Sequence, residues 1–278
     1  MKKNAIVTGA NTGMGKETAR ELARLGMSVV MACRNRQKGE AARKEIVAET
    51  GNQDVQVMLL DLASRASIRG FVREYSEKHD RLDVLVNNAG LSLTDRTEAE
   101  GVETTIATNH LGPFLLTNLL LDLLKKANRA RVVIVASMVH RNARFDPEDF
   151  DGKKKWTGYG AYSNSKLLNI LFGFELARRL AGTGVSVNCL TPGLVNSDFF
   201  RNYARIPFML RAVKRLIGRA PAEGAKTAIW LASAPDVDGV TGKYFERRAE
   251  IKASPAARDE ALARKVWEIS ERLTGLKG

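Results

Sequence analysis

Short apolar runs alternate with longer amphipathic stretches along most of the chain. The runs are rich in Val, Ile, Ala and Leu, and the stretches between them repeat their apolar positions at helical spacing. Strand and helix patterns in alternation are typical of a parallel sheet connected by crossover helices. The pattern predicts an α/β fold with a doubly wound, seven-stranded parallel sheet and helices on both faces. Its strands are expected at 5–8, 28–32, 55–60, 84–86, 131–136, 185–190 and 243–245.

Two long segments interrupt this rhythm. Residues 141–158, rich in charge, Gly and Pro, follow the fifth strand, and residues 194–220 follow the sixth. Long connections within a compact domain usually carry function. Ligands of a doubly wound sheet bind at the carboxyl ends of its strands, so both segments are expected beside the site.

Length and composition suit one soluble domain. The chain has 278 residues, 44% of them hydrophobic, which is enough for one large core spanning residues 1–278. No apolar run approaches the ~20 residues of a membrane helix. Met1-Lys2-Lys3 leads almost directly into the first strand pattern, which leaves no room for a signal peptide. We therefore expect a cytoplasmic protein.

The cysteines and histidines do not indicate a disulfide or a metal centre. Cys33 and Cys189 each lie in an apolar strand pattern, as buried free thiols do. His79, His110 and His140 are scattered without the spacing of metal ligands, so no metal site is expected.

The formal net charge is +13. An excess of Lys and Arg is compatible with nucleic acid or an anionic membrane surface as partner, and charge alone does not choose between them.

A glycine-rich turn lies where the first strand should lead into the first helix. It reads Thr8-Gly9-Ala10-Asn11-Thr12-Gly13-Met14-Gly15. Glycines there allow a tight turn and a close backbone approach to a diphosphate, which the helix N-terminus also favours. The turn predicts a Rossmann-type dinucleotide site, with Gly9, Asn11, Thr12, Gly13, Met14 and Gly15 as contacts. A plain tight turn is the alternative.

Residues after the second and third strands indicate the kind of dinucleotide. Arg34 and Asn35 stand where an acidic residue would bind the adenosine ribose hydroxyls. A guanidinium there can bind a 2′-phosphate, which favours NADP(H) over NAD(H); a solvated arginine is the alternative. Asp61, with Leu62 after it, could accept from the adenine amine or could cap the following helix.

Tyr162 and Lys166 are candidates for proton transfer. In a helix beginning near Tyr159 they lie one turn apart on the same face, where an ammonium favours the phenolate form of the tyrosine. The pair alone is also compatible with an ordinary helix surface. Ser137, at the end of the fifth strand, would face the same crevice and could hold a substrate carbonyl, or it could cap a turn.

Together these motifs resemble the short-chain dehydrogenase/reductase family. The matches run in order along nearly the whole chain and also include Asn87-Asn88-Ala89-Gly90, Asn109 and Pro192-Gly193. The resemblance implies a catalytic tetrad of Asn109, Ser137, Tyr162 and Lys166. It further implies that Asn88, Ala89 and Gly90 line the adenosine side and that Tyr162 and Lys166 contact the cofactor, Lys166 through the nicotinamide ribose. Pro192, Gly193 and Val195 would hold the carboxamide, and Ser197 keeps a hydroxyl where the family commonly has threonine.

A narrower resemblance is to the retinol-dehydrogenase-like and protochlorophyllide-reductase-like branch. It rests on Ala32-Cys33-Arg34-Asn35, on the long connection between Ser137 and Tyr162, and on the tail at about 255–273. In that tail an apolar stripe indicates a helix that docks on the body of the domain. The branch implies a small hydrophobic carbonyl or alcohol as substrate. Its membrane-bound members usually carry an N-terminal hydrophobic anchor, for which this sequence shows no pattern.

Residues 205–219 have an amphipathic, basic helical pattern without an acidic residue. It could be a substrate lid within about 194–220, a peripheral contact with a membrane surface, or an ordinary surface helix. Phe199 and Phe200 favour an apolar pocket, and with Val139 they are the candidate substrate contacts.

The leading hypothesis is an NADP(H)-dependent oxidoreductase in which Tyr162 is the general acid and base. The rival is a non-catalytic protein on the same fold that senses NADP(H) or binds nucleic acid; the complete tetrad argues against it, and no nucleic acid is expected. Two copies could pair through the helices containing residues 111–127 and 159–181, as related enzymes often do.

Overall fold

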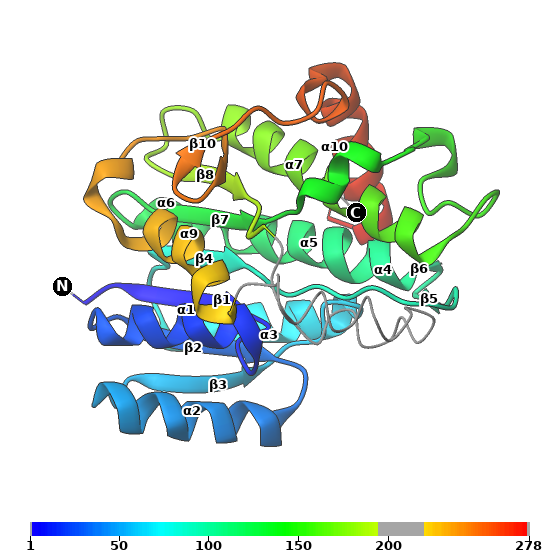
Figure 1. Cartoon of the computed structure of the whole chain (residues 1–278). Helices are drawn as coiled ribbons and strands as arrows, with labels where there is room; N and C mark the ends of the chain where they lie inside the picture. Colours follow the sequence, from blue (N-terminus) through cyan, green and yellow to red (C-terminus); the bar gives the residue numbers. More distant parts are fainter. Residues whose placement is uncertain (1, 194–219, 277–278) are drawn as a thin grey trace.

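The computed structural model describes residues 2–193 and 220–276 and has a central sheet of eight strands (Figure 1). The strand order is β10-β9-β8-β7-β4-β1-β2-β3. The strands are β1 (Asn4–Thr8), β2 (Ser28–Cys33), β3 (Val55–Leu59), β4 (Val84–Asn87), β7 (Arg131–Val135), β8 (Ser186–Leu190), β9 (Lys243–Glu246) and β10 (Ala249–Glu250). Seven of them pair in parallel, which confirms the predicted sheet. The eighth, β10, is a two-residue antiparallel strand at the edge, too short to leave a pattern in the sequence.

Burial on both faces explains why the central strands are uniformly apolar. In β7, Val132 pairs with Leu85 on one side and Val187 on the other. Every residue of β7 is buried. Because helices cover both faces of a parallel sheet, its strands need no alternation of apolar and polar positions.

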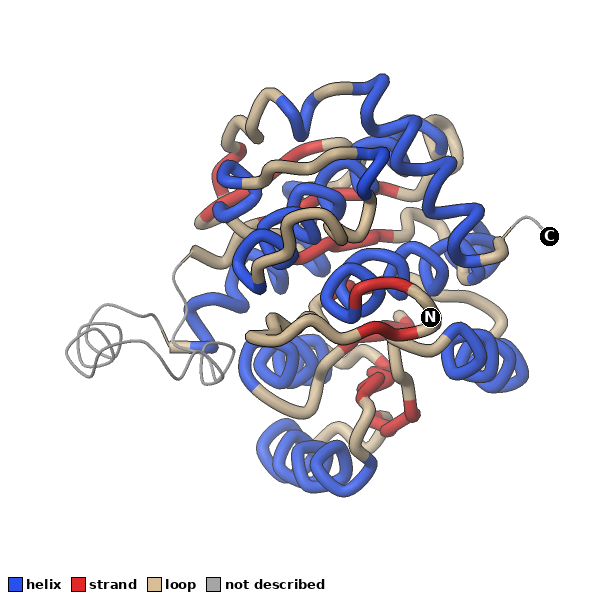
Figure 2. The backbone as a smooth tube through the Cα atoms, turned by 90° about the vertical axis from the view of Figure 1, so that its right-hand side faces the viewer, coloured by secondary structure: helices blue, strands red, loops and turns tan. Residues whose placement is uncertain are grey.

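The helices form one layer on each side of the sheet (Figure 2). One face is covered by α1 (Gly13–Arg24), α2 (Arg36–Thr50) and α9 (Pro221–Ser233), whose buried side chains form one apolar cluster with the strands. The other face is covered by α3 (Arg65–Lys78), α5 (Gly112–Leu119), α7 (Gly158–Arg179) and α10 (Glu260–Thr274), which share a second cluster. The sheet thus separates two cores.

The helical segment before β7 is broken, although a helix containing residues 111–127 was expected. It consists of α4 (Thr104–Ile106), the π-helix η1 (Ala107–Leu111), α5 and α6 (Leu121–Lys126). A hairpin of β5 (Glu98–Ala99) and β6 (Val102–Glu103) precedes it. Single π-turns within helices occur frequently at functional sites, and this one contains Asn109.

The C-terminal helix docks on the body as the apolar stripe predicted. The short 3-10 turn η6 (Ala256–Arg258) precedes α10, and Asp259 caps α10 by accepting from the Leu262 amide at 3.0 Å. Trp267 of α10 packs edge-on against Phe114 of α5, with ring centroids 4.9 Å apart, and the Arg179 guanidinium lies 4.2 Å from the Trp267 ring. Figure 1 shows α10 beside α7 and α5.

Candidate active site

The glycine turn closes against the end of β4. Gly9 has a φ of +66°, and a Cβ on Gly15 would lie only 2.4 Å from the Gly9 carbonyl oxygen and 2.5 Å from Asn88 Nδ2. Thr8 Oγ1 accepts from the backbone amides of Asn88 and Ala89 at 3.0 and 2.9 Å, and Asn88 Nδ2 donates to the Thr8 carbonyl at 2.8 Å. The turn at β1 and the segment after β4 therefore form one rigid unit. Thr8 was not among the predicted site residues, although its place before Gly9 could have indicated this role.

The start of α1 has the features of a diphosphate site. Thr12, the N-cap residue, makes no side-chain cap, and the first turn carries no acidic residue. A Cβ on Gly13 would meet open space, and Asn11 and Met14 beside it are half-buried. The free amides and dipole of a helix N-terminus favour an anion at this position.

The residues predicted to select the cofactor have different surroundings. Arg34 is exposed directly after β2. Asn35 caps α2 by accepting from the Lys38 amide at 2.9 Å, which is a structural role. Asp61 Oδ1 accepts from the Ala63 amide at 3.0 Å, while Ser64 is the residue that caps α3. The helix-cap alternative for Asp61 is thus wrong; Leu62 beside it is buried.

Tyr162 and Lys166 lie one turn apart near the start of α7, as predicted. Thr157 caps this helix by accepting from the Gly160 amide at 3.0 Å. Both side chains are buried, with exposed fractions of 9% and 3%, and Lys166 Nζ lies 5.6 Å from the Tyr162 ring centroid. Nζ donates to the Val135 carbonyl at 3.0 Å, which places it at the end of β7, two residues before Ser137. Burial lowers the pKa of Lys166 to about 8.

Asn109 is fixed by three hydrogen bonds and lies beside Lys166. Its Oδ1 accepts from the Leu91 amide at 2.8 Å, and its Nδ2 donates to the Leu91 carbonyl at 2.8 Å and to Ser165 Oγ at 3.0 Å. A Cβ on Gly90 would lie 3.3 Å from Asn109 Oδ1 and 3.5 Å from Lys166 Nζ. The absence of a side chain at Gly90 therefore allows Asn109 and Lys166 to lie close to the backbone of this residue.

Ser165 is a site residue that the sequence reasoning missed. It is fully buried, and its Oγ donates to the Tyr162 carbonyl at 2.8 Å while accepting from Asn109. Its position three residues after Tyr162 is the spacing at which a serine bonds back to its own helix, and this was the available signal.

Ser137 follows β7 and begins the 3-10 turn η2 (Met138–Asn142). Its Oγ accepts from the Val139 amide at 3.4 Å, so Ser137 does cap a turn, and Val139 is half-buried beside it. Thr191, after β8, accepts from the Met138 amide through Oγ1 at 3.2 Å and from the Gly193 amide at 3.3 Å. The ends of β7 and β8 are joined in this way.

Pro192 and Gly193 follow β8 after one residue, Thr191, at the same edge of the sheet. Gly193 has a φ of +73°. The remaining predicted residues Val195, Ser197, Phe199 and Phe200 lie outside the described residues, as does the predicted lid except for residue 220.

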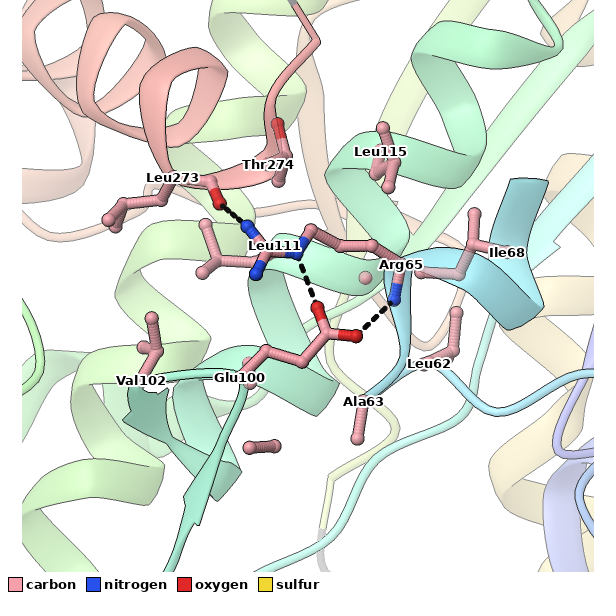
Figure 3. Close-up of a pocket in the computed structure, with 13 residues that line it drawn as sticks. Leu62, Ala63, Arg65, Ile68, Glu100, Val102, Leu111, Leu115, Leu273 and Thr274 are labelled. Carbon is pink, nitrogen blue, oxygen red and sulfur yellow. Dashed lines mark hydrogen bonds and ion pairs between the residues drawn. The ribbon is translucent and has the colours of Figure 1, made fainter.

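A pocket elsewhere on the molecule is too small for a cofactor or a substrate (Figure 3). It lies between α3, the β5–β6 hairpin, α5 and the end of α10, and its volume of about 20 Å³ is close to that of one water. Arg65 reaches across it, donating to Glu100 and, at 2.8 Å through Nη1, to the Leu273 carbonyl. No tetrad residue lines this pocket.

Both cysteines are buried free thiols, as predicted. Among residues 2–193 and 220–276, no helix combines the length and apolar character needed to cross a bilayer.

The architecture and the site define a class of protein. A doubly wound sheet with a glycine turn after its first strand, and a buried Tyr-Lys pair beside Asn109 and the end of β7, is typical of nicotinamide-dependent oxidoreductases. In agreement, the profile of the family described as short chain dehydrogenase matches residues 3–205.

Relatives match the chain over almost its whole length. Mouse retinol dehydrogenase 14 is 44% identical, with 99% of this chain and 86% of the relative covered. Bovine dehydrogenase/reductase SDR family member 13 is 45% identical, with 99% and 74% covered.

Solved structures agree. A protein of uncharacterised function from Mycobacterium paratuberculosis has a TM-score of 0.79 at 35% identity, covering 98% of this chain and 93% of that chain. A short chain dehydrogenase from Shigella flexneri complexed with NADP has a TM-score of 0.71 at 25% identity, covering 89% and 97%. This chain belongs to the short chain dehydrogenase family, and it is an oxidoreductase of the retinol-dehydrogenase-like branch.

Proposed function

We propose that this enzyme is an NADP(H)-dependent oxidoreductase that interconverts a small hydrophobic carbonyl compound and its alcohol, with Tyr162 as general acid and base. The observation that carries this proposal is the buried Tyr162–Lys166 pair, with Lys166 Nζ bonded at the end of β7 and next to Asn109. Burying an amino group is costly, and such groups concentrate at functional sites.

The described residues fit a nicotinamide dinucleotide. The glycine turn and the uncapped start of α1 suit the diphosphate, and Pro192 with Gly193 lies at the sheet edge where the nicotinamide end would follow. When bound, the cofactor supplies the hydride in reduction and accepts it in oxidation.

The protein's own groups handle the oxygen and its proton. Tyr162 donates its phenolic proton to the carbonyl oxygen in reduction and takes it back in oxidation, while the Ser137 hydroxyl holds that oxygen by a hydrogen bond. With its pKa lowered to about 8, Lys166 is still mostly charged at pH 7, and its charge favours the phenolate left on Tyr162. Asn109 and Ser165 keep α7 in register with the segment after β4.

Preference for NADP(H) over NAD(H) rests on Arg34. This side chain is exposed at the end of β2, where the adenosine ribose of a dinucleotide lies in this fold. The position thus carries an arginine and not the acidic residue that would bind the ribose hydroxyls. The solved relative that holds NADP is in keeping with this choice.

The names of the relatives support a retinoid-like substrate, which is hydrophobic and carries a primary alcohol or an aldehyde. A cytoplasmic location and pairing of copies through the central helices are further parts of the proposal. Because α10 packs on both α5 and α7, any such pair would have to accommodate α10.

Turnover with a panel of carbonyl compounds tests the function. NADPH and NADH oxidation would be followed with aliphatic, aromatic and isoprenoid aldehydes and ketones. We expect turnover with at least one hydrophobic carbonyl and a higher kcat/KM with NADPH. No oxidation of either cofactor across the panel, together with salt-dependent DNA binding, would support the non-catalytic rival.

A further inference from the structure

Two buried histidines lie next to tetrad residues and have no part in the proposed chemistry. His110 follows Asn109 directly within η1, and His140 lies three residues after Ser137 in η2. Their exposed fractions are 0% and 1%. A buried polar ring is costly unless it is hydrogen-bonded, so the partners of these rings indicate what they do.

His110 is bonded to the C-terminal helix. Its ring lies among Phe114, Phe150 and Phe172, with centroids 6.0 to 6.3 Å away, and its Nε2 is 2.8 Å from Ser270 Oγ. Ser270 Oγ already donates its one hydrogen to the Val266 carbonyl at 2.7 Å. The serine must therefore accept, and His110 Nε2 is the donor.

His140 is bonded to the same part of the chain in the opposite tautomer. The Ser254 amide donates to His140 Nε2 at 3.1 Å, so Nε2 carries no hydrogen. Nδ1 then carries the hydrogen and donates to the Ser137 carbonyl at 2.7 Å. A residue of the C-terminal segment is thereby joined to the backbone of Ser137.

The C-terminal segment, defined here as residues 251–274, is itself held at both ends. The Ile251 amide donates to the Tyr244 carbonyl at 2.8 Å. At the far end, Arg65 donates to the Leu273 carbonyl (Figure 3). Arg69 donates at 2.7 Å to the carbonyl of Gly275, the residue directly after the segment. Cations at a helix C-terminus are stabilising, so these bonds hold the C-terminal segment in place on the domain.

Both rings stay neutral near pH 7. Burial lowers the pKa of His110 to about 3, partly offset by Asn169, and burial also lowers the pKa of His140, partly offset by its bond to the Ser137 carbonyl. A neutral imidazole has one donor and one acceptor nitrogen, which is the bonding pattern of His140; for His110 the bond is that of Nε2 to Ser270.

We propose that His110 and His140 are positioning residues through which the C-terminal segment fixes Asn109 and Ser137 in the active site. The expected effect of these histidines on catalysis rests on the proposed function. The structural coupling itself, from Ser270 through His110 to Asn109, can be measured without turnover.

Ser270→Ala removes the acceptor of His110 and leaves the rest of α10 in place. Ser233→Ala is the matched control, because Ser233 of α9 makes the same bond to the carbonyl four residues earlier, that of Ile229, at 2.7 Å, and touches neither histidine. For Ser270→Ala we expect kcat to fall about two- to tenfold, the range that one hydrogen bond spans, with unchanged affinity for NADPH. Ser233→Ala should leave kcat unchanged.

Amide hydrogen exchange at Leu91 supplies a readout independent of turnover, because the acceptor of that amide is Asn109 Oδ1. Exchange should accelerate in Ser270→Ala and not in Ser233→Ala. If both variants leave Leu91 as protected as in the wild type, the coupling does not exist and the inference is overturned.

A double variant separates positioning from plain stability. In Ser270→Ala the buried ring of His110 is left without its acceptor. The double variant His110→Phe with Ser270→Ala replaces both partners, so no unpaired polar group remains, and the Tm lost in Ser270→Ala should be recovered. We expect kcat to stay low in this variant. If kcat recovers together with Tm, the histidine is only structural and the inference fails. A wild-type enzyme without any turnover would instead refute the proposed function, and Leu91 exchange would still decide the coupling.

Discussion

Acid should destabilise the fold through His110. Its ring is fully buried in the aromatic cluster between α5, α7 and α10, and burial lowers its pKa from the ordinary 6.5 to about 3. Above pH 6.5 the histidine is neutral in the folded and unfolded chain alike and makes no pH-dependent contribution. Below pH 6.5 the unfolded chain binds a proton that the folded chain does not, so stability falls as the pH falls.

The size of this effect follows from the difference between the two pKa values. Each pH unit between 6.5 and about 3 lowers the free energy of unfolding by about 1.4 kcal/mol. At pH 5 the loss from this one group is therefore about 2 kcal/mol, a large share of the ~5–15 kcal/mol that stabilises an ordinary domain.

Urea unfolding at pH 7.5 and at pH 5 measures the loss, with His110→Gln as the comparison. Glutamine can still donate to Ser270 but does not titrate, while His140, His79 and the carboxyl groups are common to both chains. The wild type should lose about 2 kcal/mol more than His110→Gln between the two pH values. Equal losses in the two proteins would show that His110 is not held neutral, and the reasoning would be refuted.

Three other substitutions test separate parts of the account. Arg34→Leu should raise KM for NADPH about 10- to 100-fold with little change for NADH, because it removes charge-assisted bonds to the 2′-phosphate. Equal effects on both cofactors in steady-state kinetics would contradict the preference for NADP(H). Gly15→Ala should weaken NADPH binding by at least about tenfold in a fluorescence titration, because its Cβ would overlap the Gly9 carbonyl; unchanged affinity would contradict the described turn. Trp267→Ala should lower the free energy of unfolding by about 3–5 kcal/mol, since the indole packs on Phe114; a loss under about 1 kcal/mol would show that α10 is weakly docked.

Elements that are long or buried on both faces could be predicted from the sequence. The seven parallel strands follow from apolar runs such as Val132–Val135, and α10 follows from its single apolar stripe. The short antiparallel β10 and the β5–β6 hairpin, with two residues in each strand, are too brief to create a periodic pattern.

The break in the helix around Asn109 could not be predicted from periodicity. The side chains of η1 are almost all buried although Thr108, Asn109 and His110 are polar, so the spacing of apolar positions does not reveal the π-turn. The turn is determined by tertiary bonds, those of Asn109 to Leu91 and of His110 to Ser270, whose partners are distant in the sequence.

The site residues divide in the same way. Tyr162, Lys166 and the glycine turn show their chemistry in their spacing, and the structure places them at one edge of the sheet. Ser165 and His110 act through partners on other elements. The local signal for Ser165 is its spacing from Tyr162, and nothing in the immediate sequence distinguishes His110 from an ordinary buried polar residue.

The central claim is that the phenolic hydroxyl of Tyr162 moves the proton, while NADPH is bound mainly by other residues. The direct measurement is turnover of Tyr162→Phe, followed by the absorbance of reduced nicotinamide, together with its NADPH affinity from a fluorescence titration. The account predicts a loss of kcat of about 100-fold or more with NADPH affinity within about twofold of the wild type. Retained turnover with the phenylalanine variant would contradict it.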